Sequence, residues 1–188
     1  MDTKSIISYI ETNVGFEKIL NTCKELRIKK HTDYGDSWKI LRARSITDQI
    51  YIKAKRVRSI QEAKSAKVKD GIEGEFIAMI NYSLMALYNL KNESNKITES
   101  NNEIVFEVII SDILELLENK NHDYGEVWRT IRISSMVDFI LMKLLRLRQI
   151  EDNNYCVAHS EEATSSYKDI FNYAVFCLIR MEEGTPAY

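Results

Sequence analysis

The feature that most constrains this chain is an internal repeat with a spacing of about 90 residues. Residues 29–62 align with residues 119–152 without a gap, and the sequence NYSLMAL from Asn81 matches NYAVFCL from Asn172 after a one-residue insertion. The matched positions include Asp33/Asp123, Tyr34/Tyr124, Gly35/Gly125, Trp38/Trp128, Arg42/Arg132, Ser45/Ser135, Asp48/Asp138, Lys53/Lys143, Arg56/Arg146 and Arg58/Arg148. Self-similarity of this extent indicates two copies of one structural module.

Each copy predicts three main helices. The first carries apolar residues at 4-3-4 spacing, as from Phe106 to Leu117, and should end near the DYG sequence, where a glycine can take a left-handed conformation. The second should begin at Ser45 or Ser135, because S-x-x-D resembles a capping box. The third carries the NY pair. One proline and six glycines favour long helices over many short strands.

Three amphipathic helices per copy bury their apolar stripes best against the other copy. We therefore expect an all-α protein in which two tandem three-helix repeats pack as one pseudo-twofold helical bundle. The first repeat is assigned to residues 1–90 and the second to residues 104–188. The polar segment 91–103, which contains few apolar residues, is the predicted linker.

Lys53 and Lys143 are the most informative polar residues, because each falls inside the apolar stripe of a second helix. A lysine in such a stripe costs free energy unless its charge is paired or its ammonium reaches water. With Arg56 and Arg146 one turn further on, these lysines suit a phosphate group. The alternative is structural: the lysine head reaches solvent, or it forms an internal ion pair with the aspartate of the DYG sequence.

The DYG sequence also admits two interpretations. It can present a carboxylate and a ring to a ligand, or it can be a tight turn whose Tyr and Trp fill the core. For Asp48 and Asp138 a capping role suffices, and no chemistry is assigned to them.

Acidic residues differ between the copies. Glu115 and Glu118 lie one turn apart and can share a hard cation such as Mg²⁺. Asp169 precedes Asn172 by one turn, whereas Ala78 occupies the corresponding place in the first copy. A metal site is therefore expected on acids of the second copy. The alternative for Glu161 and Glu162 is that both are solvated surface carboxylates.

Several classes of protein receive no support. Three cysteines without a CxxC pair argue against a disulfide framework or a zinc ribbon and favour a reducing compartment. No segment approaches the roughly 20 apolar residues that span a bilayer, and the first residues do not resemble a secretory signal. A net charge of −2 gives no global attraction to nucleic acid or membrane. P-loop, Rossmann and α/β-hydrolase motifs are absent from the sequence.

Two copies of K-x-x-DYG-x-x-W…S-x-x-D…K-x-x-R, each followed by a helix with an NY pair, resemble a bacterial family. It is called nucleotide modification associated domain 1 (domain of unknown function 1599), and the tandem arrangement resembles its Bacteroidetes branch. Single-copy relatives carry E-x-x-x-D-x-x-x-D before the NY pair. Here Glu161 and Asp169 match the outer positions, while Ser165 stands at the middle one. The first copy keeps only the first acid, Asp70.

The helix-rich layout with acids on two helices is also similar, more loosely, to all-α nucleoside triphosphate pyrophosphatases such as MazG and dimeric dUTPases. In those enzymes acids hold Mg²⁺, which activates water to release pyrophosphate. The resemblance implies Mg²⁺ or Mn²⁺ at Glu115, Glu118, Asp123, Glu161 and Asp169, with Asp123 and Asp169 as catalytic carboxylates. It implies phosphate binding by Lys53, Arg56, Lys143 and Arg146, and base or sugar contacts by Tyr124 and Asn172.

Three hypotheses follow. The first is a metal-dependent pyrophosphohydrolase acting on a nucleoside or pterin triphosphate. The second is a non-catalytic nucleotide- or nucleic-acid-binding module, with a small-molecule nucleotide favoured over nucleic acid. The third is a purely structural bundle. All three place the chain in the cytoplasm and off the membrane, and a homodimer is compatible with each.

Overall fold

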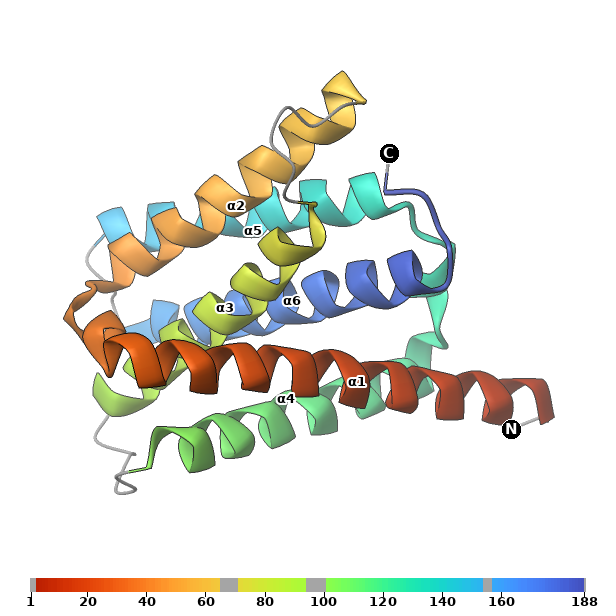
Figure 1. Ribbon diagram of the computed structural model, residues 1–188, viewed down its shortest axis with the longest axis horizontal. Coiled ribbons are helices and arrows are strands. Elements are labelled where there is room, and N and C mark those ends of the chain that lie inside the picture. The colour runs from red at the N-terminus through yellow and green to blue at the C-terminus, as the bar shows by residue number, and fades with distance from the viewer. Residues whose placement is uncertain (1–2, 65–70, 94–100, 154–156, 188) are drawn as a thin grey trace.

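The computed structural model describes residues 3–64, 71–93, 101–153 and 157–187, and it is all-α (Figure 1). In chain order the helices are α1 (Thr3–Tyr34), η1 (Ser37–Ile40), α2 (Ala43–Ala63), α3 (Glu73–Glu93), α4 (Asn102–Tyr124), η2 (Val127–Thr130), α5 (Ile133–Asp152) and α6 (Val157–Glu182). Within the described residues each copy contributes three long helices and one short 3-10 helix. The predicted all-α architecture is confirmed, and part of the predicted linker, residues 94–100, lies outside the described residues.

The six long helices form three layers, and each layer pairs equivalent helices of the two copies (Figure 1). α2 lies beside α5, α3 beside α6, and α1 beside α4. The first four of these helices close around one continuous hydrophobic core. α1 packs mainly on α6, and α4 packs on α3, so each copy's first helix covers the third helix of the other copy. The two copies therefore form one bundle.

The predicted apolar stripes line this core. The stripe residues of α2 and α5 are all buried, namely Ile46, Ile50, Val57, Ile60, Met136, Ile140, Leu147 and Ile150. Their spacing places one face of each helix inward, and burial of that face is the main source of stabilisation for helices of this length. The periodicity of the sequence was sufficient to identify these residues.

Two reciprocal ion pairs join the second helices across the pseudo-twofold axis. Arg58 of α2 lies 3.4 Å from Asp138 of α5, and Arg148 of α5 bonds Asp48 of α2. Both the arginines and the aspartates are repeat-equivalent residues. A pair that occurs in both directions is what a twofold arrangement of two similar modules produces.

The expected capping boxes are wrong. α2 and α5 begin at Ala43 and Ile133, and the residues before them, Arg42 and Arg132, make no side-chain capping bond. The serine of S-x-x-D is the third residue of each helix instead, and its aspartate lies in the second turn. Asp48 therefore has no capping role, and its carboxylate bonds Arg148 of the other copy.

The DYG sequences end the first helices as predicted. α1 and α4 stop at Tyr34 and Tyr124, and the next residues, Gly35 and Gly125, have φ of 58° and 64°. Glycine takes this conformation without the steric cost that other residues meet. The chain then enters η1 or η2, which carries the tryptophan of the repeat.

Two remaining expectations concern membranes and thiols. Within the described ranges no helix is long and apolar enough to cross a membrane. Cys23 and Cys177 are buried and not disulfide-bonded, and burial raises the pKa of the Cys23 thiol to about 12. Cys156 lies outside the described residues. Neither buried thiol has the exposed, low-pKa character of a reactive cysteine.

Candidate functional site

Lys53 and Lys143 both end in ion pairs with acids of the following helix. Lys53 Nζ lies 3.1 Å from Glu75 Oε2, and Lys143 Nζ lies 2.7 Å from Asp169 Oδ2. The lysine side chains are 29% and 20% exposed, so the pairs lie at the margin of the core. The structural alternative predicted the DYG aspartates as partners, and that detail is wrong in both copies.

The arginines one turn further on take part in the same pattern. Arg56 bonds the second oxygen of Glu75, and Arg146 contacts Glu162. Glu75 lies three residues, or one helical turn, before Ala78, which is the position equivalent to Asp169. The longer glutamate side chain bridges that one-turn difference. The four cations predicted to bind phosphate are therefore engaged with protein carboxylates in this structure.

The five acids predicted as metal ligands lie in different places. Glu115 and Glu118 border a groove between α1 and α4, whereas Glu161 is exposed near the start of α6 and Asp123 is exposed at the end of α4. Asp169 is held by two lysines, Lys143 and also Lys120 at 3.1 Å. Among the described residues no three His, Cys, Asp or Glu side chains gather as a metal site would require.

Two lysines beside Asp169 already balance its charge, which weakens its attraction for a divalent cation. These acids do not form one ligand set for Mg²⁺ in this arrangement. Of the residues predicted to contact base or sugar, Asn172 is buried, and its side-chain oxygen has no hydrogen-bond partner in the described structure. The side chain of Tyr124 lies outside the described part of the chain.

A pocket of about 700 Å³ opens beside the DYG sequence of the first copy. The end of α1, η1, the middle of α3 and the start of α4 form it, and we call it the DYG pocket. Its lining includes Lys30, Tyr34, Trp38, Asn81, Tyr82 and Asn102. The pocket thus brings together two parts of the repeat pattern, DYG…W and NY, that lie more than 40 residues apart in sequence.

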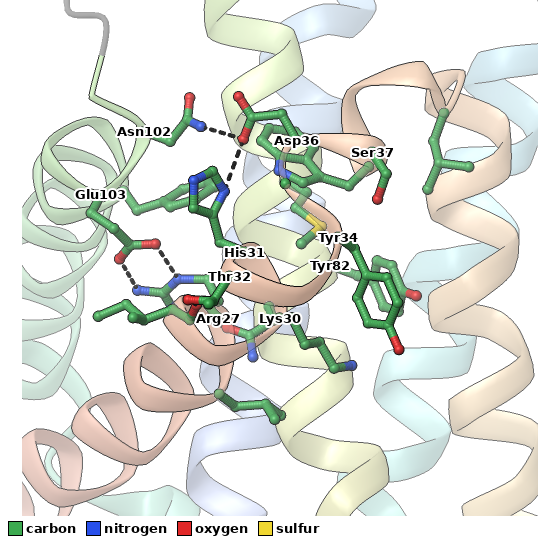
Figure 2. Close-up of a pocket in the computed structure, with 18 of the residues that line it drawn as sticks. Arg27, Lys30, His31, Thr32, Tyr34, Asp36, Ser37, Tyr82, Asn102 and Glu103 are labelled. Atoms are coloured by element: carbon green, nitrogen blue, oxygen red, sulfur yellow. Dashed lines mark hydrogen bonds and ion pairs between the residues drawn. The ribbon is translucent and has the colours of Figure 1, made fainter.

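One wall of the DYG pocket is a buried arginine network (Figure 2). Arg27 is 6% exposed, and its Nη2 and Nε donate to the Glu103 carboxylate at 3.0 and 3.3 Å. Its Nη1 donates to Asn81 Oδ1 at 2.9 Å. This network ties α1 to α3 and α4, and it fixes the asparagine of the NY pair in place.

A second polar group lies at the rim of the pocket (Figure 2). The Asp36 carboxylate lies 2.8 Å from Lys39 Nζ and 3.2 Å from His31 Nδ1, and it accepts a 2.8 Å hydrogen bond from Asn102. The hydrogen bond from Lys39, together with the other contacts, holds the pKa of Asp36 below its usual value. The η1 turn is thereby fixed to α4.

The aromatic side of the pocket shows whether the Tyr and Trp of the DYG…W sequence fill the core. Tyr34 is 70% exposed and lies on the same side of the pocket as Tyr82, with Lys30 between them and Arg27 in Figure 2. The expectation that this tyrosine fills the core is therefore wrong. For Trp128 the expectation of a core position is confirmed, because its side chain is buried and its ring stacks on Phe176 with centroids 4.3 Å apart.

The two copies differ at the position that decides the charge of the pocket. In the second copy Asp169 binds Lys120, the lysine of the K-x-x-DYG motif. In the first copy the equivalent residues are Lys30 and Ala78, and both line the DYG pocket. Lys30 has no ion-pair partner among the described residues. The first copy therefore offers an uncompensated ammonium where the second copy has an ion pair.

Most residues of the DYG pocket could not be predicted from the sequence. The K-x-x-DYG motif is recognisable in the sequence, but its spacing assigns no role to the lysine and gives no signal for Arg27, Tyr82 or Asn102. The available signal was the combination of a repeated lysine with an alanine in place of the acid at position 78. Its meaning depends on knowing that residues 30 and 78 face the same space.

Comparison with known proteins complements this geometry. Searches among curated proteins and among solved structures find no match. A model of the family described as nucleotide modification associated domain 1 matches residues 30–90 and again residues 120–181. The two matched regions are in tandem, cover more than half of the chain and coincide with the repeat. The chain is thus a tandem member of the nucleotide modification associated domain 1 family.

Proposed function

We propose that this protein is a nucleotide-binding module whose ligand occupies the DYG pocket. The observation that carries the proposal is the convergence of the DYG and NY sequences on one pocket whose lysine, Lys30, has no ion-pair partner among the described residues. The family description, which refers to nucleotide modification, is consistent with such a ligand.

The size and lining of the pocket support this ligand. Small-molecule sites commonly enclose about 300–1,000 Å³, and the DYG pocket has about 700 Å³. The rings of Tyr34 and Tyr82 offer faces on which a base can stack, and Lys30 supplies a charged donor for phosphate. The amide of Asn81 is directed by Arg27, which leaves its position defined before a ligand arrives.

Nucleic acid is a weaker candidate because most charges of the basic run at residues 53–58 of α2 are paired with acids. Lys53 and Arg56 share Glu75, and Arg58 contacts both Glu62 and Asp138. Of this run, Lys55 alone has no ion-pair partner among the described residues. One such charge is far fewer than the several phosphate contacts on which nucleic-acid affinity depends.

Replacement of Lys30 by alanine tests the proposal. Loss of a charge-assisted hydrogen bond to phosphate costs about 1.5–3 kcal/mol, so we expect Lys30→Ala to weaken nucleotide binding about 10- to 100-fold in isothermal titration calorimetry. Lys29→Ala is the matched control, since Lys29 is exposed, carries the same charge and does not line the pocket. Equal affinities for the two variants would contradict binding at Lys30.

Hydrolysis of a triphosphate is a second candidate, favoured by one observation. Glu115 and Glu118 border a groove of about 620 Å³ that Glu17 and Glu107 also line. We expect pyrophosphate release from nucleoside or pterin triphosphates in the presence of Mg²⁺ or Mn²⁺ to be lost in the double variant Glu115→Gln/Glu118→Gln. Glu161→Gln is the control outside the groove. No release with either metal from folded wild-type protein would end this candidate and leave nucleotide binding untouched.

A further inference from the structure

The DYG pocket contains several ionisable side chains but few charges that a ligand can use. On one wall, the Arg27 guanidinium donates two hydrogen bonds to Glu103 and one to Asn81. Because Arg27 is 6% exposed, its charge is balanced inside the protein by Glu103. This wall is therefore neutral, and it presents carboxylate oxygens as well as a cation to any anion that enters.

The rim of the pocket is balanced in a similar way. Asp36 lies within ion-pair distance of His31 and Lys39, at 3.2 and 2.8 Å, and it accepts a hydrogen bond from Asn102. The carboxylate stays charged near neutral pH, because these contacts favour its ionised form. A second anion brought near Asp36 would meet like charge.

Lys30 is then the one lining cation without a partner among the described residues. In the second copy its equivalent, Lys120, is neutralised by Asp169, which shows that a single carboxylate suffices to satisfy this lysine. The Arg27–Glu103 pair and the Asp36 group are already balanced, so Lys30 supplies the charge for one phosphate. Further phosphates would extend into solvent or toward Asp36 and Glu103.

We infer that the DYG pocket selects for a single phosphate, so that its ligand class is the nucleoside monophosphate rather than the triphosphate. This inference rests on the proposed nucleotide-binding function of the same pocket. The first phosphate of a ligand contacts Lys30, the base lies against Tyr34 and Tyr82, and additional phosphates contribute little affinity.

The inference is tested by calorimetric titration of the full chain with thymidine, its 5′-monophosphate and its 5′-triphosphate, and with the same three forms of adenosine. The titrations are run at constant ionic strength with a metal chelator present. We expect the first phosphate to raise affinity about 10-fold or more through its charge-assisted hydrogen bond, and the second and third to add less than about 3-fold. In Lys30→Ala, the monophosphate should bind no more tightly than the nucleoside.

Two outcomes would overturn the inference, and only the second would also overturn the proposed nucleotide-binding function. A triphosphate that binds 10-fold or more tightly than the monophosphate shows that several phosphates are recognised, and the proposed nucleotide-binding function then stands without the single-phosphate selection. Absence of binding by all six compounds, from protein with an intact thermal transition, removes the proposed function and the inference together.

Discussion

Ala78→Asp should abolish nucleotide binding by giving the first copy the ion pair of the second. In the second copy Asp169 binds both Lys120 and Lys143. An aspartate at position 78 would face the equivalent residues, Lys30 and Lys53. Two effects then combine: Lys30 loses its free charge, and the new carboxylate repels phosphate. Repulsion between unit charges about 4 Å apart near a protein surface is about 4 kcal/mol, so we expect a loss of at least 100-fold in affinity.

Ala78→Asn is the matched control, because it has nearly the same shape as aspartate without the charge. We expect it to reduce affinity by less than about 5-fold, since it neither neutralises Lys30 nor repels an anion. Both variants should keep the wild-type thermal transition, because residue 78 is only partly buried. If Ala78→Asp binds as tightly as wild type while folded, phosphate does not lie beside Lys30.

Trp128→Ala should be the more destabilising of the two equivalent tryptophan substitutions. Trp128 is 4% exposed, its ring stacks on Phe176 with an interplanar angle of 8°, and the Arg129 guanidinium carbon lies over the ring, 4.5 Å from its centroid. Replacement of a buried Trp by Ala costs about 3–5 kcal/mol through lost burial and the cavity that remains. That is a large part of the total stability of an average domain.

Trp38→Ala is the comparison that the repeat supplies. Trp38 is only partly buried and meets Tyr88 and Phe106 at ring-centroid distances of 5.1 and 5.9 Å beside an open pocket. We expect Trp38→Ala to lower the free energy of unfolding, measured by urea denaturation, by about half as much as Trp128→Ala. The reason is that less of the Trp38 side chain is buried in the folded protein. Trp128→Phe, which retains a ring, provides a milder variant if Trp128→Ala does not fold. Equal costs at positions 38 and 128 would contradict the difference in burial.

Much of the fold could be predicted because the repeat reduces the problem to one module. The stripes in α2 and α5 follow from helical periodicity, and the ends of α1 and α4 follow from glycines that tolerate positive φ. Duplication also predicts that equivalent helices meet about a pseudo-twofold axis. These properties depend on local sequence or on symmetry, and neither requires knowledge of individual side-chain partners.

The polar contacts were less predictable, because one residue type can satisfy several environments. Asp48, three residues after Ser45, fits a capping box and also fits an ion pair with Arg148, and sequence spacing does not separate the two. The ion pair of Lys53 depends on whether Glu75, one turn before the position equivalent to Asp169, can reach its ammonium. The DYG pocket results from residues that the fold, and not the sequence, brings together.

The reciprocal pairs Arg58–Asp138 and Arg148–Asp48 have a consequence for how such a chain can diverge. In a dimer of identical subunits, every substitution appears on both sides of the axis, and an acid needed on one side cannot be discarded on the other. Covalent fusion removes that restriction. In this chain the second half keeps Asp169, which pairs with Lys120 and Lys143, while the first half has Ala78 at the equivalent place beside Lys30.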